Sequence, residues 1–162
     1  MTSLETDLTV STPEERLADL GLDLPTPPSP VAIYVPAVRS GDLVYSSGQL
    51  PLVDGVIEHE GKVGQDVTLE QAQAAAQQCA LNALAAVRAI IGELGSVKKV
   101  VKVVGFVAGS PDFTGQPLVV NGASQLLADA FGSEIGSHAR SAVGVAALPL
   151  NAPVEVELIV QV

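Results

Sequence analysis

The segment VEVELIVQV (154–162) alternates aliphatic residues with mostly polar or charged ones, and this alternation indicates the architecture of the chain. A period of two places successive side chains on opposite faces of a β-strand. One face is then entirely aliphatic, while the other carries two carboxylates, Glu155 and Glu157. Such a pair of faces is typical of an antiparallel sheet that is covered on one side only. The segment therefore predicts a half-covered sheet in which it forms one strand.

The helices that cover this sheet are expected upstream. Thr68 and Gln71 form a capping box that begins the longest helix, and Gly95 is expected to end it. Small and aliphatic residues recur there at spacings of three and four, which defines one buried face: Ala72, Ala76, Cys79, Ala83, Val87, Ile90 and Leu94. A second helix is predicted within 115–132, with these inward positions: Leu118, Leu126, Leu127 and Ala130. Cys79 is interpreted as a small buried residue rather than as a reactive thiol.

The remaining strands are predicted from their β-branched content at 32–38, 43–47, 99–108 and 140–148. The last two strands of the chain are expected to pair with each other as a hairpin about Leu150 and Asn151. The order is two strands, a helix, a strand, a helix and two strands. We therefore expect an α+β fold, with an antiparallel or mixed sheet and two main helices packed on one face.

Residues 1–30 are predicted to form an N-terminal arm in front of one domain, 31–162. Thr12 and Glu15 form a capping box for a short helix in this arm. Four prolines between 24 and 30 then indicate an extended connector. The arm is too short to bury a core of its own, so we expect a single domain with an extension.

The composition narrows the class of protein. Eighteen acidic and eight basic residues give a formal net charge of −10, and non-specific nucleic-acid binders need the opposite surplus. One cysteine and two histidines leave no internal disulfide and no multi-cysteine metal cluster. No apolar run reaches the ~18–20 residues of a membrane span, and the first ten residues lack the pattern of a secretory signal. We therefore expect a cytoplasmic protein that uses no metal, cofactor, nucleic acid or membrane.

Four polar positions stand out as candidates for chemistry, and each has a structural alternative. Arg140 begins an otherwise small and apolar strand, where a planar guanidinium could bind a carboxylate or phosphate, or form an internal salt bridge. Glu155 could handle protons or be a solvated surface carboxylate. The strand end Ser47-Gly48 could let a ligand approach the backbone, and Asn121 could contact a ligand or cap a helix. These alternatives stay open on the residues alone.

Several short motifs occur together along the chain: Tyr34, SGQLP (47–51), Asn121, ARS (139–141), LP (148–149) and VEVE (154–157). In this order they resemble the signature of the YjgF/RidA (reactive intermediate deaminase A) family, over about residues 31–162. The N-terminal extension and the ending HARSAVGVAALPLNAPVEVE (138–157) resemble a longer branch, whose members carry the labels endoribonuclease or chorismate-mutase-like. One departure is Ala142, where many family members have a cysteine.

The resemblance implies a chorismate-mutase-like α+β fold that assembles as a homotrimer, with ligand clefts between subunits. It also implies hydrolysis of reactive 2-enamine/2-imine intermediates to 2-keto acids and ammonia, with no metal or cofactor. The ligand would be a small carboxylate or imino acid. An imine is already electrophilic, so orientation and one carboxylate are sufficient for its hydrolysis.

The resemblance further implies a role for each candidate residue. Arg140 would bind the substrate carboxylate, and Glu155 would position or activate the attacking water. Ser47 and the Gly48 backbone would hydrogen-bond the substrate. Three further residues would line the cleft: Tyr34, Asn121 and His138. For the last of these, which precedes the ARS motif, polar packing is the alternative to ligand binding.

The predicted hairpin bears on whether one chain holds the whole site. With its turn about Leu150, Glu155 would lie opposite Ala146, six residues from Arg140. At ~3.3 Å per residue this separation is about 20 Å, too far for one small molecule to bridge. A neighbouring subunit is therefore expected to supply one of the two residues.

Other functions remain open. The clefts could hold a small carboxylate without turnover, which would make the protein a binding module. A ribonuclease is disfavoured by the acidic charge, and RNA would have to bind near Lys98, Lys99 and Lys102. Chorismate mutase activity rests on fold analogy alone.

Overall fold

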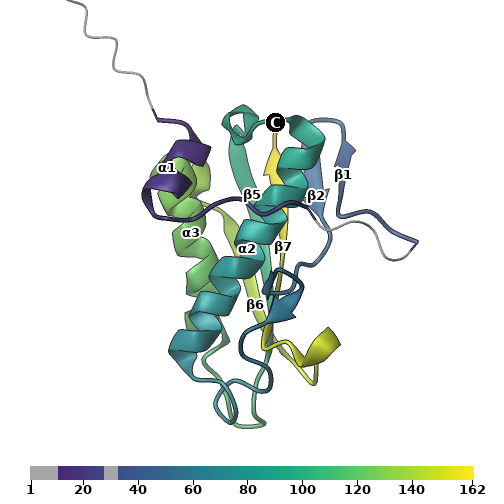
Figure 1. The fold of residues 1–162 in the computed structure, drawn as a ribbon, viewed down its shortest axis with the longest axis vertical. Coiled ribbons are helices and arrows are strands. Elements are labelled where there is room, and N and C mark those ends of the chain that lie inside the picture. Colours follow the sequence, from purple (N-terminus) through teal and green to yellow (C-terminus); the bar gives the residue numbers. More distant parts are fainter. Residues whose placement is uncertain (1–10, 28–32) are drawn as a thin grey trace, which may run out of the picture.

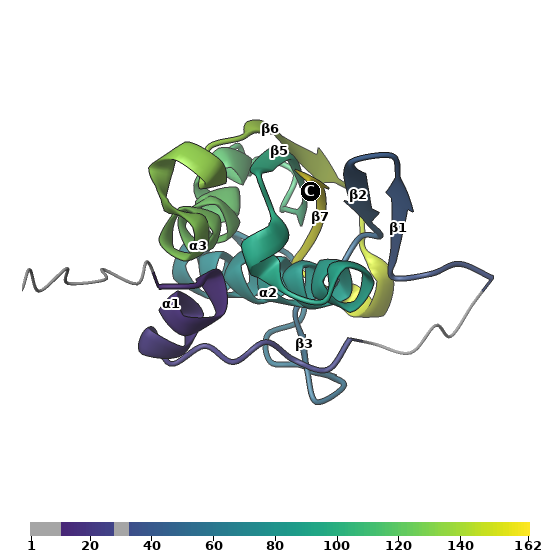
Figure 2. The ribbon, with the colours of Figure 1, turned by 90° about the horizontal axis from the view of Figure 1, so that it is seen from above.

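The computed structural model describes residues 11–27 and 33–162, and its centre is a five-stranded sheet in the order β1-β2-β7-β5-β6 (Figure 1). The strands are β1 (Ala37–Ser40), β2 (Leu43–Ser46), β5 (Lys99–Ala108), β6 (Ala139–Val145) and β7 (Val154–Gln161). The helices are α1 (Pro13–Asp19), α2 (Leu69–Ile91) and α3 (Gln116–Gly136), with single turns η1 (Leu94–Ser96) and η2 (Pro149–Asn151). A separate hairpin consists of β3 (Leu52–Val53) and β4 (Val56–Ile57). The α+β fold, with a mixed sheet and two main helices on one face, is confirmed (Figure 2).

β7 lies inside the sheet, and this overturns the predicted hairpin of the last two strands. β7 pairs antiparallel with β2 on one side and with β5 on the other, while β6 pairs parallel with β5 at the edge. β5, α3 and β6 form a crossover unit, which joins parallel neighbours rather than a hairpin. The helix-facing residues of β7 are at most 1% exposed. The strand with the continuous aliphatic face therefore lies inside the sheet, and the helices cover that face.

The helices approach each other and the sheet closely because small residues line their contacts. Five positions of the predicted α2 face are fully buried: Ala72, Ala76, Cys79, Ala83 and Val87. A Cβ on Gly122 of α3 would lie 2.0 Å from the Gln73 carbonyl oxygen of α2. A Cβ on Gly105 of β5 would lie 2.3 Å from a methyl carbon of Val120 on α3. These glycines set the spacing of α3 against α2 and against the sheet.

Three predicted positions in the helices are wrong. α2 ends before Gly92, whose φ of 89° lets it act as the C-cap in place of Gly95. Ile90 therefore lies in the last turn and is 43% exposed. Leu118 is also exposed, and the inward face of α3 begins instead with Val119 and Val120.

By length and composition alone α2 could cross a membrane, since an 18-residue window within it has a mean hydropathy of 1.3. That window is 56% buried inside the fold, where α2 packs on the sheet and on α3. The protein core therefore accounts for the apolar face of α2.

The short helix α1 is fastened to the rest of the structure. Its predicted capping box is present, because the Glu15 N–H donates to Thr12 Oγ1 at 3.2 Å and the Thr12 N–H donates to Glu15 Oε2 at 2.8 Å. Leu17 is 1% exposed within the core, and Glu14 accepts from the Leu94 N–H at 2.6 Å. The end of the proline-rich connector lies outside the described residues, so the proposed division at residue 30 stays a prediction.

Candidate functional site

The first part of the site is built around Arg140 at the β6 edge. Arg140 is in register with the buried Val103, so its side chain leaves the sheet on the helix side and lies along α3. Its Nη1 donates to Asn121 Oδ1 at 2.8 Å and to Ser124 Oγ at 3.2 Å, and its Nη2 donates to the Pro117 carbonyl oxygen at 3.3 Å. The acceptors are spaced four and three residues apart, so they share one face of the helix. Within residues 11–27 and 33–162 Arg140 forms no ion pair with a carboxylate.

His138 extends this group of polar side chains. Its Nε2 lies 2.9 Å from Ser124 Oγ, and its Nδ1 lies 2.6 Å from the Gly136 carbonyl oxygen. Both ring nitrogens therefore have protein partners. Ser124, which joins His138 to Arg140, was not predicted; its position three residues after Asn121, on the same helix face, is the signal that could have identified it.

The second part of the site is built around Glu155, on the face of the sheet that carries no helix. Gln49 pairs with Val156 of β7, and the preceding Gly48 lies against the Glu155 side chain. A Cβ on Gly48 would lie 1.9 Å from Glu155 Oε1, so only glycine leaves room for this carboxylate. Burial, and secondly the nearby Glu157 carboxylate, raise the pKa of Glu155 above its ordinary value of 4.5.

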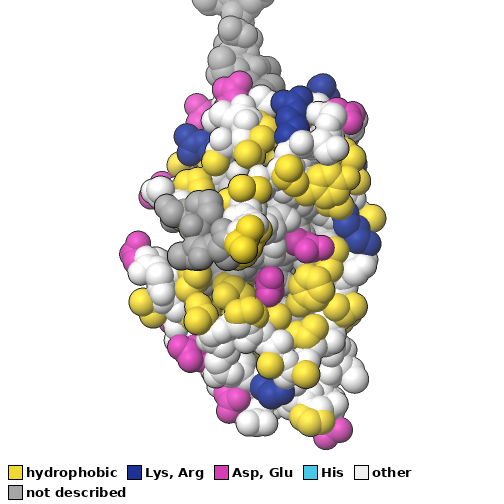
Figure 3. All heavy atoms as spheres, turned by 90° about the vertical axis from the view of Figure 1, so that its right-hand side faces the viewer, with side chains coloured by type: hydrophobic (Ala, Val, Ile, Leu, Met, Phe, Trp, Pro, Cys, Tyr) yellow, Lys and Arg dark blue, Asp and Glu magenta, His cyan; other side chains and the backbone are white. Residues whose placement is uncertain are grey.

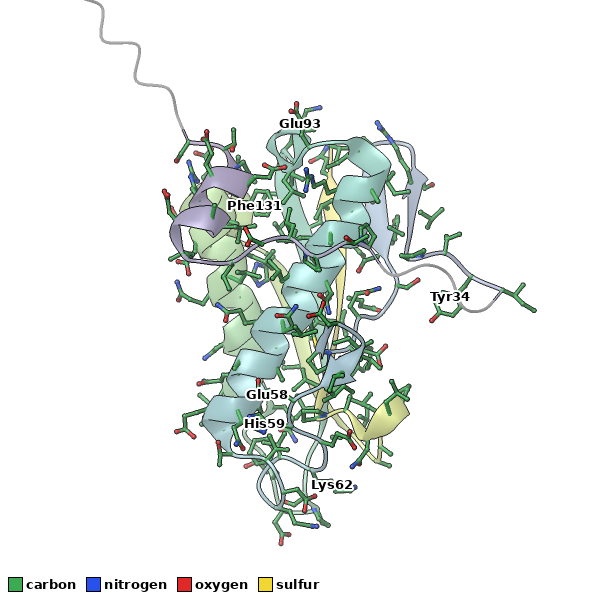
Figure 4. All side chains as sticks on the ribbon, viewed as in Figure 1. Tyr34, Glu58, His59, Lys62, Glu93 and Phe131 are labelled. Atoms are coloured by element: carbon green, nitrogen blue, oxygen red, sulfur yellow. The ribbon has the colours of Figure 1, made fainter. Side chains whose placement is uncertain are left out.

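Ser47 connects this second part to the segment before β1. Its hydroxyl donates to the Val35 carbonyl oxygen at 2.6 Å, and its N–H donates to the Pro36 carbonyl oxygen at 2.8 Å. Tyr34 belongs to the same segment and is 61% exposed, and Figure 4 shows it projecting from the side that carries β1. Hydrophobic side chains are spread over this side of the molecule, among charged ones (Figure 3). In β1 and the segment before it, Tyr34, Val35 and Val38 are more than half exposed.

One chain does not bring Arg140 and Glu155 together. Arg140 is in register with Val103 and Glu155 with Phe106, so they lie three residues apart along the strands and two strands apart across the sheet. At ~3.3 Å per residue and ~4.8 Å per strand, this places their backbones about 14 Å apart. Their side chains also leave opposite faces of the sheet. The predicted hairpin geometry is wrong, and the backbones lie about 14 Å apart rather than the predicted ~20 Å, but the two residues still do not meet within one chain.

A separate groove lies on another part of the described structure. A volume of ≈ 470 Å³ opens between the β3–β4 hairpin and α2, and its lining includes His59 and Gln71 (Figure 4). None of the predicted site residues borders it. No group of three or more His, Cys, Asp or Glu side chains that could hold a metal ion occurs in the described ranges.

Comparison with known proteins identifies the family. The model of a family described as Endoribonuclease L-PSP matches residues 25–162, most of the chain. The chain belongs to this family. Protein TCP17 of Trypanosoma cruzi is 46% identical over 146 residues, which cover 90% of this chain and 91% of that protein.

Solved structures agree with this assignment. Atu1372 of Agrobacterium tumefaciens, a protein of unknown function, is 49% identical, with a TM-score of 0.86 over 93% of this chain and 92% of its own. The YjgF gene product of E. coli is 28% identical, with a TM-score of 0.57 over 84% of this chain and 93% of its own. The predicted membership of the YjgF/RidA family and its chorismate-mutase-like fold are confirmed.

Proposed function

We propose that this protein hydrolyses reactive 2-enamine/2-imine intermediates to 2-keto acids and ammonia. The observation that carries the proposal is the set of groups that surround the Arg140 guanidinium. Its guanidinium is held by three neutral oxygens of α3, and no carboxylate of the described chain neutralises it. Such a cation keeps its attraction for a ligand carboxylate, which 2-imino acids carry.

Glu155 supplies the proton chemistry in this proposal. Its carboxylate takes a proton from a water molecule as the water oxygen adds to the imine carbon, and it then gives this proton to the imine nitrogen. The resulting carbinolamine then loses ammonia, and the carbon–oxygen double bond of the keto acid forms. A half-buried carboxylate with a raised pKa suits this role, because its basicity is greater than that of a solvated one.

The site is completed between subunits of a homotrimer. Arg140 and Glu155 leave opposite faces of one sheet, so a single small ligand meets both only if two chains contribute. The exposed hydrophobic side chains on the β1 side provide a surface suited to such a contact. In this arrangement Ser47 and the Gly48 backbone hydrogen-bond the ligand, and Tyr34 and Asn121 border it.

The test uses an amino-acid oxidase to supply the imine and semicarbazide to trap whatever the protein does not hydrolyse. We expect the wild-type chain to compete with the trap and Arg140→Ala to lose about 100-fold or more in kcat/KM, because two charge-assisted hydrogen bonds to the carboxylate disappear. Arg88→Ala is the matched control, since this half-exposed arginine lies 3.9 Å from Glu14, at the far end of α2. An Arg140→Ala chain that stays folded and fully active would refute the proposal.

The same experiments distinguish two other functions from hydrolysis. If 2-keto acids bind the wild type but not Arg140→Ala, and no hydrolysis occurs, the protein is a binding module. Ribonuclease activity is the weaker alternative: Lys99 donates to the Glu134 carbonyl oxygen at 2.6 Å, and Lys102 to Ser141 Oγ at 2.9 Å. These ammonium groups already have protein partners. Cleavage of RNA that survives Arg140→Ala would favour that alternative.

A further inference from the structure

We propose that Ser124 and His138 are positioning residues, which hold the Arg140 guanidinium ready for a ligand carboxylate. This inference rests on the proposed function of Arg140 and adds two residues that act through it. It gives His138 a role other than direct contact with the ligand.

The two partners of the His138 imidazole differ in what they can do. The Gly136 carbonyl oxygen, 2.6 Å from Nδ1, can only accept a hydrogen bond, so Nδ1 carries the proton. In the neutral ring Nε2 then has a lone pair. The Ser124 hydroxyl, 2.9 Å away, therefore donates its hydrogen to Nε2.

This direction of donation matters at Arg140, because a serine hydroxyl has one hydrogen and two lone pairs. With its hydrogen directed to His138, Ser124 accepts from Arg140 Nη1 at 3.2 Å. A serine inside a helix can otherwise donate to the carbonyl four residues earlier, here that of Val120. The imidazole therefore keeps Ser124 oriented as an acceptor toward Arg140.

The backbone that anchors this series of hydrogen bonds is tightly packed. A Cβ on the buried Gly136 would lie 2.5 Å from the Leu127 carbonyl oxygen, so the last turn of α3 packs directly against an earlier turn of the same helix. The same turn is tied to β5 by Lys99, whose Nζ donates to the Glu134 carbonyl oxygen at 2.6 Å and to Ser137 Oγ at 2.8 Å. The Gly136 carbonyl is thus held in place and orients the imidazole.

The consequence is a guanidinium with one free edge. Asn121 and Ser124 take both hydrogens of Nη1, and Pro117 takes one hydrogen of Nη2. Nε–H and the other Nη2–H have no acceptor in the part of the chain that the structure describes. Two parallel N–H groups match the two oxygens of a carboxylate. Fixing them before the ligand arrives reduces the conformational entropy lost on binding.

Substitutions at His138 separate this role from simple packing. Glutamine places its side-chain oxygen near the position of Nε2, so His138→Gln retains an acceptor for Ser124. Asparagine reaches only the position of Nδ1, so His138→Asn loses that acceptor. Ser124→Ala removes the acceptor toward Arg140 directly.

The measurement is the dissociation constant of 2-oxobutanoate, by titration calorimetry on the full chain. We expect His138→Asn and Ser124→Ala each to raise it about 3–10-fold, and His138→Gln to stay within about 2-fold of wild type, because one hydrogen bond is at stake. The double variant should bind no more weakly than Ser124→Ala, since His138 acts through Ser124. In the hydrolysis assay, KM should rise in parallel while kcat is unchanged.

Arg140→Ala serves as the reference that distinguishes the carboxylate-binding role of Arg140 from the positioning role of Ser124 and His138. If it binds 2-oxobutanoate like the wild type, the carboxylate-binding role of Arg140 fails, and the positioning role fails with it. If it loses binding while His138→Asn binds normally, only the positioning role is overturned. The positioning role is also overturned if His138→Gln binds 2-oxobutanoate as weakly as His138→Asn does. It is overturned as well if the double variant binds more weakly than Ser124→Ala.

A readout without ligand completes the test. The chain has two histidines, so the nitrogen resonances of His138 can be assigned by comparison with a His59→Asn variant. In the neutral ring we expect a protonated Nδ1 and an unprotonated Nε2. The opposite tautomer would reverse the Ser124 hydrogen bond and overturn the proposal.

Discussion

The two halves of the candidate site are built in opposite ways. At the β6 edge, neutral oxygens of α3 surround the Arg140 cation and stabilise it. On the open face of the sheet, Glu155 is half-buried near a second carboxylate, and the backbone of Gly48 lies against it. The surroundings supply hydrogen-bond acceptors to the first group and disfavour the charged form of the second.

This difference suits Arg140 to ligand binding and Glu155 to catalysis. A cation held by neutral acceptors is free to attract an anionic ligand, and its fixed edge sets the ligand's orientation. A carboxylate whose ionisation is disfavoured accepts a proton more readily than a solvated one. Each of the following changes acts on one half and leaves the other intact.

The largest effect is expected from Glu155→Gln. The amide keeps the shape of the side chain but cannot accept the proton of the attacking water, so kcat should fall about 10²–10⁴-fold. Binding of 2-oxobutanoate should change little, because the Arg140 half is untouched. The semicarbazide-trapping assay and titration calorimetry measure the two quantities. Unchanged turnover would show that Glu155 does not handle protons.

The same variant should gain stability with a specific pH dependence. The pKa of Glu155 in the folded chain is raised above its ordinary value of 4.5, so the ionised carboxylate costs stability. That cost is absent below the unfolded pKa, appears as the pH rises through the folded pKa, and is complete above it. Glu155→Gln should therefore be more stable than the wild type at neutral pH and equal to it near pH 4, as measured by denaturant unfolding.

A smaller loss is expected from Gly48→Ala. The new Cβ would lie 1.9 Å from Glu155 Oε1, so the carboxylate must move. The collision is with the end of a flexible side chain, and we expect the fold to survive. A displacement of about 1 Å in a reacting group can cost about 10–10²-fold in kcat. Gly95→Ala is the control, because nothing lies within 4 Å of its added Cβ. Full activity in Gly48→Ala would show that the function of Glu155 does not depend on glycine at position 48.

The fold was largely predictable because its signals are local. The alternation at 154–162 and the small-residue face of α2 each fix which side of an element is buried. The pairing partner of β7 is not local: the same alternation fits a hairpin with β6 or a place between β2 and β5. Only the crossover through α3, which makes β6 parallel to β5, decides between them.

The site was predictable as a set of residues but not as an arrangement. Motif resemblance singled out Arg140, Glu155 and Gly48, yet the reason that position 48 is glycine is the Glu155 carboxylate, 107 positions later in the chain. Ser124 has no motif of its own; its spacing from Asn121 is a weak signal, and its role becomes clear through its contacts with Arg140 and His138. Tertiary contacts of this kind leave no periodic pattern in the sequence.

The smallest effect is expected from Asn121→Asp, which gives Arg140 a counterion that none of the described residues supplies. Aspartate has the shape of asparagine, and its carboxylate would pair with Arg140 Nη1, which donates to Asn121 Oδ1 at 2.8 Å. The pair competes with the ligand carboxylate for the cation, so the dissociation constant of 2-oxobutanoate should rise about 10-fold.

Stability should change little in Asn121→Asp, because exposed ion pairs contribute only about 0–1 kcal/mol. Gln125→Glu adds the same charge on the exposed face of α3 and should leave binding unaltered, which separates a local effect from a change in net charge. If Asn121→Asp binds as tightly as the wild type, the neutrality of the α3 acceptors is irrelevant to the ligand. The environment of Glu155 would then be the one remaining difference between the two halves that bears on function.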